Sequence, residues 1–250
     1  MNYSTVSTRL CLTALLGIVL AAPLPSHAGK PANITAAEMA LLPAYCPDTM
    51  GFGYGDAYHN TSPNASKWVA MMGKDFWHMH HHCWALISYR RAERATLPAS
   101  DKLRLRKAAH VDFWYVANNA SPDFVMLPEI YTWIGRTELL LRNPRAAADA
   151  FARARTLKPD YVPAYTHLAE FFLAQGNRKE ALKVVLEGLQ HAPQAKGLLH
   201  LYRELGGKPE NLPKKDLPLE NIQTEPAKSD AAGQPDVSSP TAPVQQVPLD

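Results

Sequence analysis

The sequence lacks the charge imbalance and the catalytic signatures that would place it in several large classes of protein. Its 250 residues carry a formal net charge of only +3, and Arg9 contributes to that excess. Nothing in this balance suggests a nucleic-acid partner, which would require dense Lys and Arg. There is also no Cys-x-x-Cys-His haem site, no His-Glu-x-x-His motif and no Gly-x-Ser-x-Gly elbow. We therefore expect a protein that is not an enzyme and does not bind nucleic acid.

Long hydrophobic runs are missing as well, apart from one near the N-terminus. Residues 10–22 are almost entirely apolar, follow Arg9 and precede Ser26-His27-Ala28. The run is shorter than the roughly 20 apolar residues that a membrane-spanning helix needs. A positive charge, a short apolar core and a small-x-small site are typical of a cleavable secretory signal. We predict that residues 1–28 are removed on export to the periplasm or medium, with a retained anchor as the alternative. After cleavage, only partners would associate the chain with a membrane.

Cysteine is scarce, and its usage fits export. Of the three cysteines, Cys11 lies within the predicted signal, which leaves Cys46 and Cys83. An even count in an exported chain makes a disulfide the default. Closing a loop of about 37 residues would contribute roughly 3–4 kcal/mol by the chain-entropy estimate, less any strain. We predict a Cys46–Cys83 disulfide that ties the N-terminal region to the first long helix.

Most of the remaining chain has helical periodicity. Residues 29–65 are irregular and rich in Gly and aromatics, with one short helix predicted at Ala36–Leu42. Helical periodicity begins near Ser66 and breaks at Gly73. A longer helix capped by Asp75 is predicted from Phe76 to about Ala95, and another, capped by Ser100 or Asp101, ends near Asn119. The face of the first long helix that should be buried contains Phe76, Met79, Cys83, Leu86 and Ile87.

A 34-residue pattern occurs twice, without insertion, between Pro128 and Pro193. Large, apolar, small and proline positions recur at the same offsets. The first copy has Tyr131, Ile134, Gly135, Ala147, Phe151, Ala154 and Pro159, and the second has Tyr165, Leu168, Ala169, Ala181, Val185, Gly188 and Pro193. This period and this pattern resemble the tetratricopeptide repeat, which consists of two antiparallel helices per unit. The resemblance implies an all-α helical solenoid that binds a protein or peptide.

A third, degenerate repeat is predicted from the same resemblance. Its first helix would carry Trp84, Ile87 and Ser88, and its second Trp114, Ala117 and Pro122. This pair would occupy residues 66–127, and residues 128–207 would hold the two clear repeats followed by a capping helix from Gly197 to Leu205. Residues 208–250 contain eight prolines and no Phe, Trp or Tyr. Such a segment cannot bury enough apolar surface to fold, so we predict a disordered tail.

The resemblance also implies which side chains would face a partner. In this family the first helix of each unit lines a groove, at repeat positions that correspond here to Glu129, Thr132, Arg136, Leu139, Leu140, Pro163, Thr166, Glu170, Leu173 and Ala174. The mixture suggests an extended or helical segment of a partner protein, in an envelope or export complex. The alternative is that these residues contact only water or the chain's own tail.

Two departures from the family pattern predict looser packing. Glu138 occupies a position where the family usually has an aromatic residue, which should loosen the first clear repeat. Val185 and Gly188 replace the usual aromatic–Ala pair of the second, which should weaken the solenoid near its C-terminal end.

The histidine-rich stretch from Trp77 to Trp84 suggests chemistry. On one helix, His78 and His82 could converge on a metal ion with His81 beside them, and imidazoles suit Zn or Cu. Two or three ligands are too few, so His59, Asp56 or Asp48 would have to contribute. The alternative, which we favour, is a stacked surface that holds the N-terminal loop, with no cofactor.

Overall fold

The computed structural model describes residues 29–52 and 62–212, in which every regular element is a helix. The predicted signal at 1–28, the loop residues Tyr54, Asp56, Tyr58 and His59, and the tail from residue 213 lie outside the described residues. Within the described ranges, no helix is both long and apolar enough to cross a membrane.

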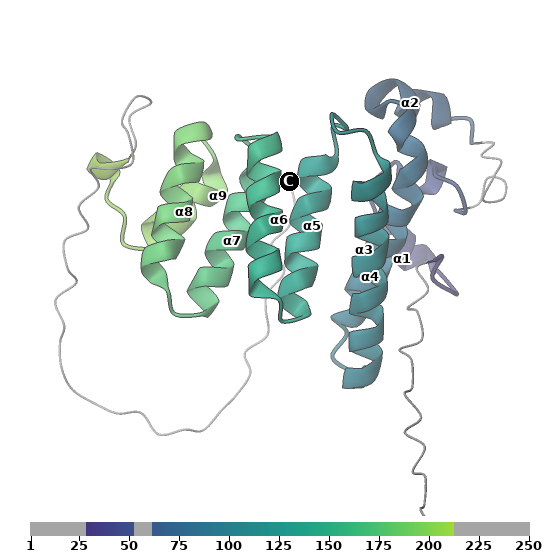
Figure 1. Cartoon of the computed structure of the whole chain (residues 1–250), viewed down its shortest axis with the longest axis horizontal. Helices are drawn as coiled ribbons and strands as arrows, with labels where there is room; N and C mark the ends of the chain where they lie inside the picture. Colours follow the sequence, from purple (N-terminus) through teal and green to yellow (C-terminus); the bar gives the residue numbers. More distant parts are fainter. Residues whose placement is uncertain (1–28, 53–61, 213–250) are drawn as a thin grey trace, which may run out of the picture. The chain divides into compact units, whose positions relative to one another are not determined.

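The helices follow one another in chain order, separated by short connections (Figure 1). Residues 29–78 form short elements, and the longer helices begin at Met79. The elements are α1 (Ala36–Ala40), η1 (Cys46–Asp48), α2 (Ala65–Met72), η2 (Lys74–His78), α3 (Met79–Ala92), α4 (Ala99–Asn119), α5 (Leu127–Leu140), α6 (Pro144–Leu157), α7 (Val162–Ala174), α8 (Arg178–His191), α9 (Lys196–Glu204) and η3 (Pro209–Asn211), where η marks a 3-10 helix.

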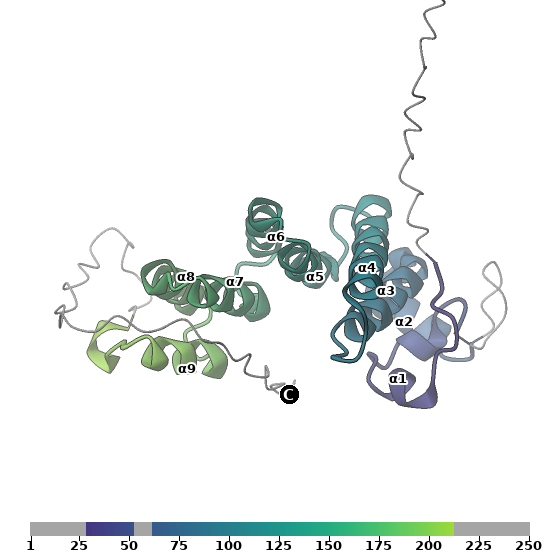
Figure 2. The same ribbon diagram turned by 90° about the horizontal axis from the view of Figure 1, so that it is seen from below.

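The long helices pack in adjacent pairs, so the predicted all-α, repeat-like fold is confirmed. The closest pairs are α3 with α4, α5 with α6, and α7 with α8. The first helices of the clear repeats also pack side by side, since α5 contacts α7 and α7 contacts α9 (Figures 1 and 2). The N-terminal pair differs, because it packs against α5 mainly through α4, its second helix. The degenerate unit is therefore a helix pair with its own docking geometry.

The buried residues form two hydrophobic cores. One extends from Leu42 to the small residues of α6 and includes most of α3, and the other extends from Ala147 to Leu205. Helix α6 belongs to both, since Ala154 lies in the first core and Phe151 in the second. The first clear repeat thus joins the two cores.

The start and the surroundings of the first long helix differ from the prediction. Its beginning is the 3-10 helix η2, and α3 starts only at Met79. The five residues assigned to its buried face are indeed buried. However, burial continues almost all round α3, including His80, His82 and Ser88. Because α3 lies between the N-terminal segment and α4, a one-sided helical wheel underestimates its burial.

Both predicted helix caps in this region are wrong. The buried Asp75 carboxylate accepts a hydrogen bond from the backbone N–H of Ser121, 3.1 Å away, and so serves a tertiary contact. Helix α4 begins at Ala99, after Pro98 as N-cap, with no side-chain cap. Proline has a fixed φ suited to this boundary, so the chain turns into the helix before Ser100.

Close steric fit explains why small residues recur in the repeats. A Cβ atom added at Gly135 would lie 2.8 Å from the Phe151 ring. One added at Gly188 would lie 2.7 Å from Cδ1 of Leu198 and 2.8 Å from Cγ of Tyr165. Gly188 therefore lets α8 approach both α7 and α9. The absence of a methyl group at Gly188 therefore leaves no gap here, and the predicted weakening at this end stays a prediction.

The first helices of the two clear repeats end in the same backbone motif. Arg142 and Gly176, 34 residues apart, have positive φ angles of 64° and 72°. After each, the backbone N–H of Asn143 or Asn177 donates to the carbonyl five residues earlier, at 2.9 and 2.8 Å. This is the Schellman ending, which normally uses glycine. The first repeat adopts it with an arginine.

Glu138 gives the first clear repeat a polar bridge instead of a loose packing site. The side chain is buried, and its carboxylate is 2.7 Å from Nε2 of His110 on α4 and 2.9 Å from Nδ2 of Asn143. The predicted loosening is therefore wrong. A buried carboxylate is stabilised when hydrogen bonds satisfy both of its oxygens, as they do here.

The folded chain continues beyond the predicted boundary at residue 208. After α9, the Tyr202 hydroxyl donates to the Lys208 carbonyl at 3.0 Å, and η3 follows. Disorder from residue 208 is thus wrong for residues 208–212, where a buried aromatic side chain satisfies the backbone. From residue 213 onward the disordered tail stays a prediction.

Candidate protein-binding face

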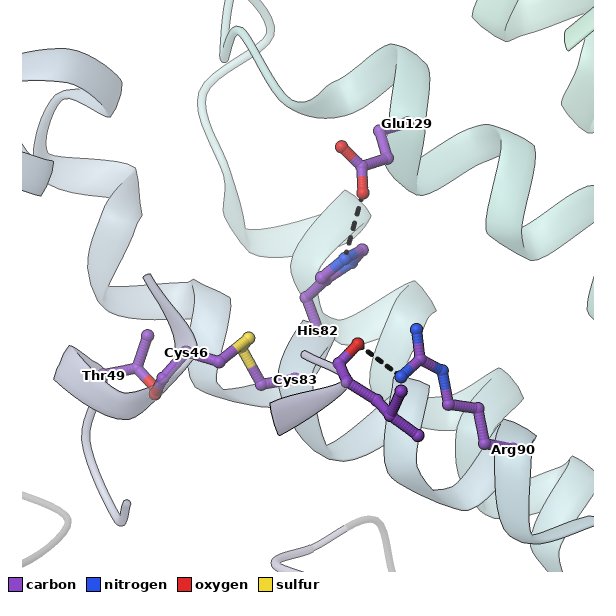
Figure 3. Close-up of a disulfide and its surroundings, with 7 residues drawn as sticks. Cys46, Thr49, His82, Cys83, Arg90 and Glu129 are labelled. Atoms are coloured by element: carbon purple, nitrogen blue, oxygen red, sulfur yellow. Dashed lines mark hydrogen bonds and ion pairs between the residues drawn. A yellow bond between two sulfur atoms is a disulfide. The ribbon is translucent and has the colours of Figure 1, made fainter. Parts of the chain in front are cut away.

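The N-terminal segment is covalently attached to α3, as predicted. Cys46 and Cys83 form a disulfide with their Cα atoms 5.8 Å apart, and both side chains are fully buried (Figure 3). The Thr49 hydroxyl donates to the Cys46 carbonyl at 2.8 Å. The segment that carries Tyr45 is therefore fixed against the helix that carries His82.

Charged contacts hold α1 on the C-terminal half of α3. Glu38 accepts from Arg91 at 2.7 and 2.8 Å and from Arg94 at 2.7 Å. The paired guanidinium of Arg91 lowers the pKa of Glu38 to about 2, although burial opposes the shift. Arg90 donates to the carbonyl of Leu41. Bidentate arginine–carboxylate pairs are among the more specific polar contacts in proteins.

Asp48, one of the candidate metal ligands, is occupied by protein donors. Its carboxylate accepts from the Ser62 hydroxyl at 2.5 Å, from Asn64 Nδ2 at 3.3 Å and from Trp68 Nε1 at 2.7 Å. Burial raises the pKa of Asp48, but these hydrogen bonds outweigh burial and the pKa lies below its usual value. Asp48 therefore holds α2 against η1.

The predicted metal ligands His78, His81 and His82 point to different partners. His78 ends η2 and is half-buried. Nδ1 of His81 is 2.6 Å from the fully buried carboxylate of Asp112, and its ring stacks on Tyr115 at 3.7 Å between centroids. Because His78 precedes the α-helix, it does not share the helical spacing with His82 on which the metal hypothesis depended.

The described residues contain no group of three or more His, Cys, Asp or Glu side chains that could hold a metal ion. His80 instead contacts the Trp77 carbonyl through Nδ1 at 2.7 Å. Burial and the neighbouring His81 lower the pKa of His80 to about 4, so this ring is neutral at physiological pH. The His80 and His81 rings pack against each other and against Trp84, and His81 also stacks on Tyr115. Two further candidate ligands, Asp56 and His59, lie outside the described residues.

His82 links α3 to the first clear repeat. Its side chain is fully buried, and its Nε2 lies 3.4 Å from a carboxylate oxygen of Glu129 on α5 (Figure 3). The ring also contacts Phe113 and Tyr45, with centroids 5.4 and 6.4 Å away. At 3.4 Å the His82–Glu129 contact is an ion-pair distance rather than a good hydrogen bond.

Glu129 remains accessible although it lies beside this buried ring. Its side chain is 30 % exposed. Burial raises the pKa of Glu129, but the contacts with His82 and Trp133 outweigh burial and the pKa lies below its usual value. The carboxylate is therefore ionised near neutral pH. Burial and the Glu129 charge together raise the pKa of both Tyr45 and Tyr161. The His82 ring, which contacts Tyr45 as well as Glu129, connects the Tyr45 phenol to this carboxylate.

One turn along α5, Trp133 forms a platform for Arg136. The Trp133 ring stacks on Phe113 at 5.8 Å with an interplanar angle of 14°. The Arg136 guanidinium lies 4.1 Å from the Trp133 centroid and 5.2 Å from that of Tyr89 on α3. Arg136 has no ion-pair partner in the part of the chain that the structure describes. A cation held over two aromatic rings is positioned without being neutralised.

These three side chains define a surface that we call the α5 strip: Glu129, Trp133 and Arg136. They are four and three residues apart, so they lie along one face of α5. Tyr45, His82 and Tyr89 border the strip from the N-terminal region. The strip therefore carries negative charge at one end, positive charge at the other, and an indole between.

The other predicted groove residues divide into interior and accessible groups. Thr132 is 3 % exposed and donates to the Pro128 carbonyl at 2.8 Å, so its predicted contact with a partner is wrong. The leucines are half-buried against the two cores, and Thr166 donates to its own helix. Glu170 is exposed, with one oxygen 3.0 Å from Nδ1 of His167. The half-buried leucines are Leu139, Leu140 and Leu173.

Comparison with protein families agrees with this geometry. Residues 139–202, from the end of α5 to α9, match the family model described as tetratricopeptide repeat. This segment of the chain is similar to tetratricopeptide repeats. Such repeats are protein-interaction modules and are generally not catalytic. The search of curated proteins returned no match.

Sequence reasoning identified Glu129 and Arg136 but missed the aromatic side chains around them. Trp133 lies between the two along α5 and carried a detectable signal, because a tryptophan one turn from a charged groove position suggests a platform. Tyr45 and Tyr89 carried no such signal. The fold alone brings Tyr45, from a segment more than 80 residues earlier, beside Glu129.

Proposed function

We propose that this protein is an exported interaction scaffold, which binds a partner polypeptide through α5 and α7 and supports a bacterial envelope or export complex. One observation carries the proposal. Three charged side chains at repeat positions that line the groove in this family, Glu129, Arg136 and Glu170, keep accessible surface. Charges of both signs on one accessible surface favour partners with the complementary charge pattern.

The proposed compartment is the periplasm. The features of residues 1–28 favour export, and a buried Cys46–Cys83 disulfide suits an oxidising environment. Membrane association would then occur only through partners. Cell fractionation with a C-terminal tag tests this directly: the processed chain should appear in the periplasmic fraction without free thiols. Tagged protein in the cytoplasm with three free thiols, those of Cys11, Cys46 and Cys83, would contradict the proposal.

Partner binding is tested by capture from envelope extract after chemical cross-linking. The variant Arg136→Gln/Glu170→Gln removes one charge of each sign from α5 and α7. We expect it to lose a partner that the unaltered protein captures, with an unchanged melting temperature.

The matched control is Arg145→Gln/Asp149→Asn, which removes the same charges from exposed positions of α6. It should retain the partner. An identical set of captured proteins for the two variants and the unaltered chain would argue against this face as the binding surface.

A further inference from the structure

We propose that the α5 strip recognises an extended, proline-containing segment of a partner that carries one basic and one acidic side chain three residues apart. This inference names the ligand chemistry of the proposed interaction function and rests on it. The basic side chain would meet Glu129, and the acidic side chain would meet Arg136.

The acidic end of the strip has unused hydrogen-bonding capacity. The ionised Glu129 is 30 % exposed, and its only ion-pair partner among the described residues is His82, at 3.4 Å. The Tyr45 hydroxyl beside it is buried and has no hydrogen-bond partner. A buried hydroxyl without a partner costs free energy. An ammonium or guanidinium group that pairs with Glu129 could also donate to this hydroxyl and remove that cost.

The basic end presents guanidinium groups without a carboxylate. Arg136 lies on Trp133 and Tyr89, which fixes the plane of its guanidinium, and none of the described acidic residues pairs with it. Arg90 directly follows Tyr89, whose ring the Arg136 guanidinium contacts, and burial and the Arg136 charge lower the pKa of Arg90. Arg90 donates to the Leu41 carbonyl and pairs with no described carboxylate. The Arg136 guanidinium is therefore suited to a partner's carboxylate, which arginine can bind through two hydrogen bonds.

The spacing of the two ends selects the conformation of the ligand. Seven residues of α-helix separate Glu129 from Arg136, a rise of about 10 Å. In a polyproline II segment, residues i and i+3 lie on the same side about 9.3 Å apart. In a β-strand, side chains on one face are about 7 or 13 Å apart, which fits less well.

A helical ligand is less suited to this surface. Helices usually dock by inserting an apolar face into a hydrophobic groove. The exposed large hydrophobic residues of the described chain all lie outside α5: Leu41, Met71, Leu103, Tyr115, Val125 and Leu157. The strip itself offers charges and aromatic edges, which favour a short extended segment.

Calorimetry with synthetic peptides tests the proposal on the full oxidised chain in low-salt buffer. The reference peptide contains Lys-Pro-Pro-Asp between Gly-Ser ends. Its relatives replace Lys by Gln, replace Asp by Asn, or shorten the spacer to one Pro. The reference should bind about tenfold more tightly than each relative, because one charge pair is lost or misplaced. Equal affinity for the shortened peptide, or no binding of the reference, would overturn the proposal.

Protein variants assign each charge to its end of the strip. Glu129→Gln should weaken binding of the Lys-Pro-Pro-Asp peptide about tenfold and leave the Gln-Pro-Pro-Asp peptide unaffected, as in a double-mutant cycle. Arg136→Gln should behave in the same way towards the Asn-containing peptide. Asp149→Asn, at an exposed position of α6 outside the strip, serves as the matched control and should change nothing. Equal losses from Glu129→Gln and Asp149→Asn would contradict the assignment, and the peptide series stays informative even if one variant folds poorly.

The two proposals can fail separately. If Arg136→Gln/Glu170→Gln loses a cellular partner but no peptide binds the unaltered chain, the charge-pair ligand is wrong and the scaffold function stands. If the peptides bind as expected but no partner is captured, the strip is a binding site and the scaffold proposal fails.

Discussion

The N-terminal region, residues 29–119, and the repeat region, residues 127–212, are stabilised in different ways. The N-terminal region depends on individual cross-links: the Cys46–Cys83 disulfide and the Glu38–Arg91 ion pair. The repeat region depends on close packing of small against large residues, as at Gly188. One kind of contact connects segments distant in sequence, and the other recurs every 34 residues.

This difference indicates that the two regions have different structural roles. Repeated steric contacts can be extended unit by unit, since each unit buries its neighbour's apolar face. Irregular cross-links place particular side chains, here Tyr45, His82 and Tyr89, beside the first repeat. The α5 strip lies where the two regions meet, because α5 contributes to the repeat stack and also contacts the N-terminal pair.

The largest effect is expected from loss of the disulfide. Cys46→Ala/Cys83→Ala should lower the free energy of unfolding of the N-terminal region by about 3–4 kcal/mol, because a loop of about 37 residues is no longer closed in the unfolded state. Four of the five tryptophans, from Trp68 to Trp114, lie in this region, and Trp133 stacks on Phe113 at its border, so tryptophan fluorescence reports mainly on this region in a urea titration. Circular dichroism of the same samples should retain a later transition from the repeats. If the fluorescence and circular dichroism transitions of this variant occurred at the same urea concentration, the disulfide would not stabilise the N-terminal region separately from the repeats.

Adding a methyl group at a glycine of the repeats should lower the stability of the repeat region. Gly188→Ala is expected to destabilise the protein by about 1–3 kcal/mol, because the new Cβ would overlap Leu198 and Tyr165. Thermal unfolding by circular dichroism measures the loss. Gly197→Ala is the control, since no atom lies within 4 Å of its added Cβ, and it should be neutral or stabilising. Equal stability of the two variants would refute the steric explanation.

Acid should weaken the N-terminal region through Glu38. Its pKa is about 2 in the folded protein against 4.5 for an ordinary glutamate, so its ion pair stabilises fully above about pH 5 and is lost as the pH falls towards 2. Glu38→Gln should therefore cost about 1 kcal/mol at pH 7, and the difference from the unaltered protein should vanish near pH 2. Tryptophan fluorescence in urea at several pH values measures it. Asp123→Asn, at an exposed position, should give no pH-dependent difference.

The smallest change in stability is expected from substitutions at the equivalent helix ends of the two repeats, Arg142 and Gly176. Arg142→Gly should stabilise the protein by about 0.5–1 kcal/mol, because glycine adopts the positive φ of 64° without steric cost. Gly176→Ala, at the equivalent position, should destabilise by about 1 kcal/mol for the same reason. Chemical denaturation of both variants measures the pair. Changes of the same sign would mean that the two helix ends are not equivalent.

Local and periodic features were predictable from the sequence, whereas polar tertiary contacts were not. The repeat helices, α1 and the break at Gly73 follow patterns that depend on nearby residues, and the structure confirms them. Asp75 and Glu138 were misjudged because their hydrogen-bond partners, Ser121 and His110, lie far away in the sequence. A helical wheel cannot distinguish such a partner from solvent.

The residues of the candidate site also fall into those that the repeat register predicts and those that only tertiary contacts decide. Glu129 and Arg136 could be identified from the repeat register, because each position of a periodic fold has a defined orientation. Thr132 shares that register and is nevertheless buried, since neighbouring elements cover it. The histidine cluster suggested a metal because four rings are close in sequence. In the fold, His80, His81 and His82 face separate polar groups, namely the Trp77 carbonyl, Asp112 and Glu129, and His78 contacts the Tyr115 ring.

The sequence by itself determined that this protein is a helical repeat protein, because a 34-residue period is a property of the chain. It also predicted the Cys46–Cys83 cross-link, because these are the two cysteines that follow the predicted signal. Only the tertiary structure decided that Tyr45, His82 and Tyr89 border Glu129 and Arg136. The physical reason is that the N-terminal pair docks through α4, in a geometry that the repeat pattern does not encode. That docking positions an aromatic border beside two opposite charges and so produces the α5 strip.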